Sequence, residues 1–294
     1  MPALAALLLV GLAWGLTIPL TRISVSTGHD PLGLIFWQLL ISALVLGLVI
    51  ALRGRRPPYA ARHLGLLLLV AVLGTLLPNS FSYRAAAHLP AGVMAIAIAM
   101  VPMFALPVAV LLRLDRVEGK RLIGIALGAA AIALIYLPET ALPRIDPVWI
   151  LVALVAPLCY GLEGNSIAKI GTGGLDPVEV LFGASLIGVL LALPLATTGG
   201  RWVDPFADPG AAEFALLLNG FVHAAAYTGY VYLVGRAGSV FAAQVSYIVT
   251  GSGVVWSMLL LGESYTAWVW AAFVLLFAGL SLVTPRPPRP GQIA

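Results

Sequence analysis

The chain of 294 residues is 61% hydrophobic and only 10% charged, whereas a typical soluble domain carries about 25% charged residues. This composition excludes an ordinary soluble protein, because most of such a protein's exterior must face water. The formal charge of +4 does not indicate nucleic acid as a partner, since the basic residues form short clusters between apolar runs. A single cysteine, Cys159, excludes an internal disulfide and a cysteine-rich metal site, and we expect no cofactor. We therefore predict an all-α, polytopic membrane protein surrounded by lipid.

Apolar runs long enough to cross a membrane follow one another along the chain. A bilayer core is about 30 Å thick, so a spanning helix needs about 20 mostly apolar residues. The runs are too long for β-strands and lack their alternating pattern. With breaks placed at charged residues, proline and glycine, the sequence predicts ten transmembrane helices. They cover residues 3–23, 32–52, 64–84, 91–112, 119–137, 148–168, 177–198, 212–234, 239–261 and 266–284.

The second half of the chain repeats landmarks of the first half at an offset of 146 residues. Trp14-Gly15-Leu16 is matched by Tyr160-Gly161-Leu162, and Asp30-Pro31 by Asp176-Pro177. One repeat of this length predicts two copies of a single unit. Because each unit holds an odd number of spans, the second copy enters the membrane from the opposite side. We therefore predict two inverted five-helix repeats, the design of many secondary transporters, with a binding site near the midplane between them.

Basic residues predict the orientation and the domain boundaries. With the amino terminus inside, twelve basic residues fall in the inside breaks and four in the outside breaks. The positive-inside rule then places both termini in the cytoplasm, and we expect a bacterial inner (plasma) membrane. The first repeat covers residues 1–137 and the second covers residues 148–284, joined by a periplasmic linker at 138–147. The Pro/Arg-rich residues 285–294 are predicted to be a disordered cytoplasmic tail.

Short motifs near the helix ends resemble those of a known transporter family. They are Ala13-Trp14-Gly15, Pro90-Ala91, Gly238-Ser239 and Leu261-Gly262-Glu263. On these motifs the whole chain resembles the EamA family of the drug/metabolite transporter superfamily. It is most similar to the branch of bacterial amino-acid exporters that includes the aromatic amino-acid exporters. The resemblance implies a secondary carrier whose central cavity is bounded by spans 1, 3, 4, 6, 8 and 9. Two positions depart from the pattern: Leu112-Arg113-Leu114-Asp115 replaces Leu-Gly-Glu in the first half, and Tyr160 replaces tryptophan.

Two ionisable residues lie inside predicted spans, where such groups are costly and are by default functional-site candidates. Glu163 occupies the repeat position of Thr17 and lies toward the cytoplasmic side of span six. It would contact a substrate ammonium group or take up a proton. Alternatively, it is a structural carboxylate paired with Lys169 or Arg236. His223, near the middle of span eight, would help bind a carboxylate or amide, or else form a hydrogen bond between helices.

Polar and aromatic residues in the spans complete the candidate substrate site. Asn79 follows Pro78, whose missing N–H frees a carbonyl and bends the helix; the alternative is a kink satisfied by neighbouring helices. Aromatic rings offer stacking surface, although Trp and Tyr also gather at membrane interfaces. The predicted substrate-binding residues are Trp14, Thr17, Gln38, Asn79, Tyr83, Tyr160, Glu163, His223, Tyr227, Gln244, Ser246 and Tyr247. The predicted hinges, where Pro or Gly permits kinks, are Pro78, Pro102, Gly238 and Gly251. Glu263, just after span nine, is predicted to be a cap or a packing carboxylate.

These features predict a transporter, secondary active or facilitative, that exports amino acids by alternating access. Aromatic amino acids and other apolar ones are the expected substrates, because a cavity of aromatic and few polar groups suits a partly apolar solute. A cationic drug, a nucleotide sugar or another metabolite remains as an alternative solute. An intramembrane enzyme acting on lipid is an alternative of another class. We do not expect an enzyme, since the sequence contains no P-loop, His-Glu-x-x-His or Gly-x-Ser-x-Gly motif.

Overall fold

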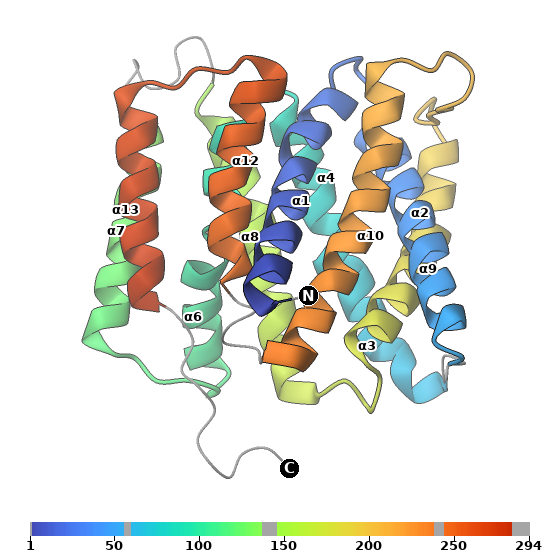
Figure 1. Cartoon of the computed structure of the whole chain (residues 1–294), viewed down its shortest axis with the longest axis horizontal. Coiled ribbons are helices and arrows are strands. Elements are labelled where there is room, and N and C mark those ends of the chain that lie inside the picture. Colours follow the sequence, from blue (N-terminus) through green and yellow to red (C-terminus); the bar gives the residue numbers. More distant parts are fainter. Residues whose placement is uncertain (1, 56–59, 137–145, 238–243, 284–294) are drawn as a thin grey trace.

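A computed structural model describes residues 2–55, 60–136, 146–237 and 244–283 of the chain (Figure 1). Every regular element in these residues is helical, which confirms the all-α prediction. The elements are α1 (Ala3–Ser24), α2 (Pro31–Leu52), the 3₁₀ turn η1 (Ala61–His63), α3 (Leu64–Leu69), the π-helix η2 (Val70–Leu76), α4 (Leu77–Ala86), α5 (Ala91–Ile98), α6 (Val101–Leu111), α7 (Gly119–Tyr136), α8 (Val148–Ile170), α9 (Pro177–Thr197), α10 (Ala211–Ala237), α12 (Val245–Leu261) and α13 (Ala267–Val283).

Within the described ranges, eight helices are long and apolar enough to cross a membrane. They correspond to the first eight predicted spans, with Ala61–Ala86 and Ala91–Leu111 each counted as one helix. The last two predicted spans coincide with the shorter apolar helices Val245–Leu261 and Ala267–Val283. The number of ten spans therefore stays a prediction. The predicted tail, and the predicted linker apart from residues 146 and 147, lie outside the described residues.

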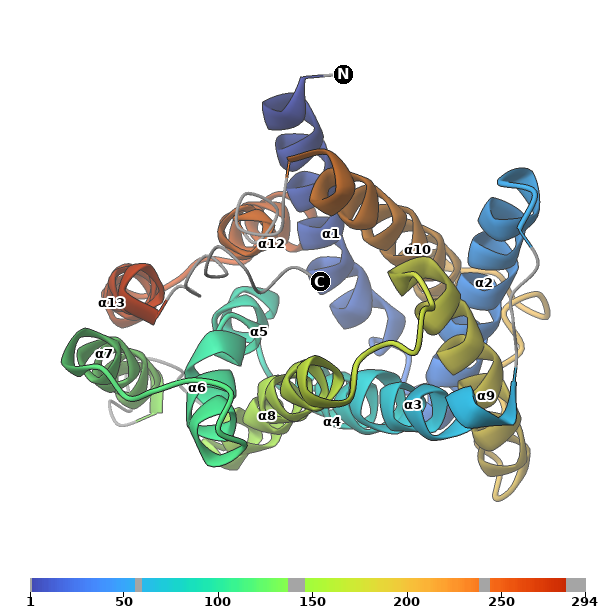
Figure 2. The ribbon, with the colours of Figure 1, turned by 90° about the horizontal axis from the view of Figure 1, so that it is seen from below.

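The helices stand side by side, and successive ones run in alternating directions (Figure 1). α1 starts and α13 finishes toward the same end of the bundle, which is the lower end in Figure 1. We call this the inner end and the opposite one the outer end, after the orientation that the basic residues predict. The sidedness itself stays a prediction. Seen from the inner end, the first-half helices α4 and α5 lie beside α8 of the second half, while α1 lies beside α10 and α12 (Figure 2).

The helices of the two halves pack in the same pattern. α1 packs against α10 and α12, and its repeat counterpart α8 packs against α4, α5 and α6. Counterpart spans also pack against one another: α2 against α9, α5 against α12, and α7 against α13. In addition, α2 packs against α10, and its counterpart α9 packs against α3 and η2. Since α1 and α8 run in opposite directions, this arrangement fits two inverted repeats.

The repeated aromatic-Gly landmark has a packing role in both halves. A Cβ on Gly15 would lie 2.9 Å from the Val249 carbonyl oxygen of α12. A Cβ on Gly161 would lie 3.0 Å from the Ala105 backbone nitrogen of α6. Glycine at these two positions lets α1 and α8 approach the backbone of the next packed helix, as small residues do in membrane bundles.

Two predicted spans are not continuous α-helices, which corrects the sequence-based boundaries. Span three, predicted as residues 64–84, is built from η1, α3, η2 and α4. The π-helix η2 ends before Leu77, whose N–H donates to the Val72 carbonyl five residues earlier. Pro78 explains it, because a proline ring clashes with the carbonyl four residues before it and cannot donate to it. Span four is interrupted between α5 and α6, just before Pro102 in the first turn of α6.

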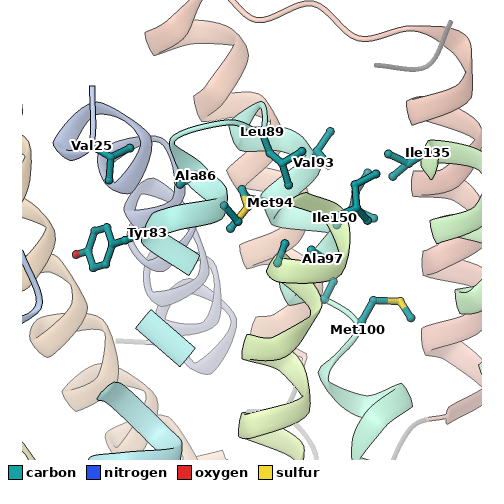
Figure 3. Packing of buried hydrophobic residues seen from close by; sticks show 14 of the residues in the cluster. Val25, Tyr83, Ala86, Leu89, Val93, Met94, Ala97, Met100, Ile135 and Ile150 are labelled. Atoms are coloured by element: carbon teal, nitrogen blue, oxygen red, sulfur yellow. The ribbon is translucent and has the colours of Figure 1, made fainter. Parts of the chain in front are cut away.

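The largest buried cluster fixes the part of the bundle around α4 and α5. Side chains from these helices interlock with Ile150 of α8 and Ile135 of α7 (Figure 3). Tyr83 is the largest fully buried side chain of this cluster, with 2% of its surface exposed. α4 is therefore held on several sides, and its polar residues Asn79 and Tyr83 have defined positions.

Candidate functional site

Four aromatic rings gather between α1 and α10, toward the middle and inner part of the bundle. The Trp14 ring meets His223 edge-on at a centroid distance of 5.8 Å, Tyr230 at 5.9 Å and Tyr227 at 6.3 Å. These edge-to-face arrangements are the preferred geometry of aromatic pairs. We call these four residues the Trp14 cluster. Three of them, Trp14, His223 and Tyr227, are predicted site residues, and Tyr230 joins them one turn further along α10.

Glu163 lies on α8 and its carboxylate faces the π-helical part of span three. A Cβ placed on Gly74 of η2 would overlap one carboxylate oxygen and lie 3.0 Å from the other, so a larger residue there would displace the carboxylate. Glu163 interacts electrostatically with two tyrosines. One is Tyr160, one turn earlier in α8, and the other is Tyr227 of the Trp14 cluster. The carboxylate thus stands between span three and the aromatic cluster.

The described residues give Glu163 no ion-pair partner. They also supply no hydrogen bond to its carboxylate, and the predicted alternative of a pair with Lys169 or Arg236 is absent among them. Glu163 is partly buried, and a carboxylate that is partly withdrawn from water without a cation or a hydrogen-bond donor is costly.

Gln38, Asn79 and Tyr83 form one polar network between α2 and α4. The Gln38 Oε1 atom accepts from Asn79 Nδ2 at 3.2 Å and from the Tyr83 hydroxyl at 2.9 Å. Gln38 and Tyr83 are both buried. The network therefore joins the two helices, which is the structural interpretation of Asn79 that the sequence left open.

Thr17 also has its hydrogen bond satisfied locally, because its hydroxyl donates to the Trp14 carbonyl at 2.6 Å. The remaining predicted site residues belong to span nine. Gln244 and Ser246 are exposed at the start of α12. Tyr247 contacts Phe277 of α13, with ring centroids 5.7 Å apart. Of the predicted hinges, Pro78 and Pro102 adjoin helix irregularities, Gly251 faces open space, and Gly238 lies outside the described residues.

The outer end carries contacts between the halves whose partners the sequence did not reveal. Glu263, in the loop between α12 and α13, accepts hydrogen bonds from the Ala91 N–H at 2.8 Å and the Gly92 N–H at 3.2 Å. The predicted role as a cap is thus confirmed, and the capped helix is α5 of the other half. The Tyr265 hydroxyl donates to Glu263, and burial together with that carboxylate raises the Tyr265 pKa, so the hydroxyl stays protonated. We call Glu263, Tyr265 and the first turn of α5 the outer latch.

A hollow of about 390 Å³ opens beside the outer latch. It is lined by Arg22, Ile23, Val25, Ser26, Ala87 and Leu261. These residues come from the outer ends of α1, α4 and α12, whereas Glu163 lies near the inner end of α8. The hollow is therefore distinct from the group formed by Glu163 and the Trp14 cluster.

The fold and these contacts define a multi-pass helical membrane protein whose two halves enclose polar and aromatic groups. Comparison with known families agrees: the sequence model of the EamA-like transporter family matches residues 1–137 and 147–284. The chain belongs to the EamA-like transporter family. It is thus a membrane transporter, in keeping with the drug/metabolite transporter superfamily that the motifs resemble.

Structural comparison supports the same fold. Among solved structures, 18 chains match. One, described only as "Crystal structure of protein", is similar with a TM-score of 0.62 over 95% of this chain and 96% of that chain. Its sequence identity of 16% shows a shared fold alone. No curated protein matches the sequence of this chain.

Proposed function

We propose that the protein is a secondary carrier that exports amino acids, with aromatic and other apolar ones preferred. The observation that carries this proposal is the carboxylate of Glu163, which lies beside the Trp14 cluster and has no ion-pair partner in the described part of the chain. An α-ammonium group would supply the missing positive charge, and an aromatic side chain would stack against the rings of Trp14 and Tyr227. The His223 ring would supply an N–H to the α-carboxylate of the same solute.

Alternating access is the proposed mode of transport. The π-helix η2 and the break between α5 and α6 both lie in helices that contact α8, and irregular turns are where helices bend. Pro78 and Pro102 adjoin these irregular turns, so we propose them as hinges, together with Gly251 of α12. Movement of spans three and four, and of their counterparts α10 and α12, would open the site toward one side at a time.

Transport into proteoliposomes tests the substrate. Purified protein should take up radiolabelled tryptophan and phenylalanine saturably, and Glu163→Gln should reduce the initial rate by about tenfold or more, the typical effect of losing a charged hydrogen-bond partner. Asp208→Asn is the matched control, because Asp208 is an exposed loop carboxylate and its removal should leave the rate unchanged. Absence of saturable uptake of any amino acid would rule out the proposed substrate.

A cationic drug or other amine is the second candidate, since a Glu163 carboxylate without a partner among the described residues suits any organic cation. The two are separated by tryptamine, which keeps the indole and the ammonium group of tryptophan but lacks the carboxylate. Transport of tryptamine in preference to tryptophan would favour the second candidate. Dependence on both charged groups of the solute would favour the first.

A further inference from the structure

Arg22, near the outer end of α1, is a half-buried cation with no carboxylate partner in the described ranges of the chain. Its Nη1 donates to the carbonyl of Ala86, the last residue of α4, at 2.6 Å. A cation is favourable at a helix C-terminus, and this bond holds the guanidinium in a defined position. The bond uses one of the five N–H groups of arginine. The edge formed by Nε and Nη2 makes no hydrogen bond to the described residues.

Arg22 is one of the residues that line the outer hollow. The hollow of about 390 Å³ has the size of a small-ligand pocket, and its other lining groups are mostly apolar side chains with one hydroxyl, that of Ser26. It is formed by both halves, because Ile23 and Ala87 come from the first half and Leu261 from the second. A fixed, planar cation in such a setting matches the two oxygens of a carboxylate.

We propose that the outer hollow is a binding site for the carboxylate of an organic solute, with Arg22 as the recognition residue. The inference rests on the proposed function in one respect, namely that this carboxylate belongs to the exported amino acid. The two charged groups are then arranged in order along the bundle. Glu163 near the inner end receives the ammonium group, and Arg22 at the outer end receives the carboxylate before release.

Indole-3-acetate tests the site, because it carries a carboxylate and an aromatic ring but no ammonium group. Its binding to purified protein is measured by calorimetry. We expect Arg22→Gln to weaken binding by about tenfold to a hundredfold, as loss of a charged hydrogen-bond partner does. Arg84→Gln is the matched control, since Arg84 is an exposed arginine of α4 near the same end. Arg84→Gln should keep wild-type affinity for indole-3-acetate.

A purely structural role of Arg22 gives a different result. If Arg22 only caps α4, Arg22→Gln lowers thermal stability but the folded protein binds indole-3-acetate as the wild type does, which overturns the inference. Should Arg22→Gln fail to fold, Leu261→Trp fills the hollow from α12 and leaves Arg22 and Ala86 themselves unchanged. It must then abolish binding, and unchanged binding in Leu261→Trp equally overturns the site. So does an absence of indole-3-acetate binding to the wild type.

Failure of the inference and failure of the proposed function are distinguishable. Tryptophan transport that persists while indole-3-acetate binding is independent of Arg22 removes only the outer site. Conversely, Arg22-dependent binding of indole-3-acetate in a protein that transports no amino acid keeps the carboxylate site and removes the proposed solute.

Discussion

Asp30 and Asp176 cap two helices that are repeat counterparts and that begin at opposite ends of the bundle. The Asp30 carboxylate accepts from the Leu32 N–H at 2.9 Å, and the Asp176 carboxylate accepts from the Glu179 N–H at 3.0 Å. Each cap also faces an arginine of the other half. Arg201 lies 3.9 Å from Asp30, and Arg55 lies 2.8 Å from Asp176. These arginines are themselves separated by the repeat offset of 146 residues. The same combination of an aspartate cap and an arginine ion pair therefore occurs at both ends of the α2–α9 pair.

Removing the two caps should have unequal effects. Asp176 belongs to a capping box, since Glu179 accepts from the Asp176 N–H at 2.9 Å, whereas Asp30 makes a single cap bond. Replacing such a cap by alanine costs about 0.5–2 kcal/mol, and the exposed ion pairs add about 0–1 kcal/mol. We expect Asp176→Ala to lower the melting temperature in detergent more than Asp30→Ala does. Asp208→Ala, in an exposed loop, should not change it, and an equal or reversed order would contradict this account.

Much of the fold follows from local sequence signals. Asp-Pro favours a helix start, because aspartate caps and proline fits the first turn, and both Asp30-Pro31 and Asp176-Pro177 begin helices. The repeat offset identified counterpart helices. The π-helix before Pro78 was missed, since the proline signals a bend but does not show whether the turn widens or breaks.

Site residues were harder to predict, because the sequence marks polar groups but not their partners. Glu163 and Trp14 were identified by type and depth, and the structure brings them near Tyr227. Gln244 and Ser246 have similar chemistry, yet they lie exposed at the helix start. Gly74 gave no signal at all, because its importance comes entirely from the Glu163 carboxylate on another helix.

Gly74→Ala should disturb Glu163 directly. The new methyl group would overlap the carboxylate, so we expect slower transport, even though alanine is favoured over glycine in a helix by about 1 kcal/mol. The matched control is Gly65→Ala in α3 of the same span, where nothing lies within 4 Å of the added atom. It should stabilise the protein and leave transport unchanged.

A double-mutant cycle separates this clash from a general effect of Gly74. In the Glu163→Ala background the methyl group has room, so Gly74→Ala should no longer lower stability in a thermal melt. If Gly74→Ala lowers stability by the same amount in both backgrounds, the two residues do not interact and the assigned geometry is wrong.

Gln38 and Tyr83 should be energetically coupled. Gln38→Leu leaves the buried Tyr83 hydroxyl without its acceptor, and an unsatisfied buried group costs about 1–3 kcal/mol. Tyr83→Phe removes the donor instead. It should cost less stability, because Gln38 Oε1 still accepts a hydrogen bond from Asn79. We expect Gln38→Leu to be milder in the Tyr83→Phe background, measured by denaturation in detergent. Additive effects would show that the hydrogen bond of 2.9 Å does not contribute to stability.

The outer latch should control access to the outer hollow. Glu263→Ala removes the acceptor for two N–H groups of α5, a cap loss of about 1–2 kcal/mol that raises the open population about 5- to 30-fold. Val25, buried at the hollow, reports this opening when changed to cysteine in a Cys159→Ser background. We expect maleimide to label Val25→Cys faster by a similar factor once Glu263→Ala is added. Thr27→Cys, at an exposed position, should label at the same rate with and without Glu263→Ala. If Val25→Cys reacts equally fast in both backgrounds, Glu263 caps α5 without holding the outer end closed.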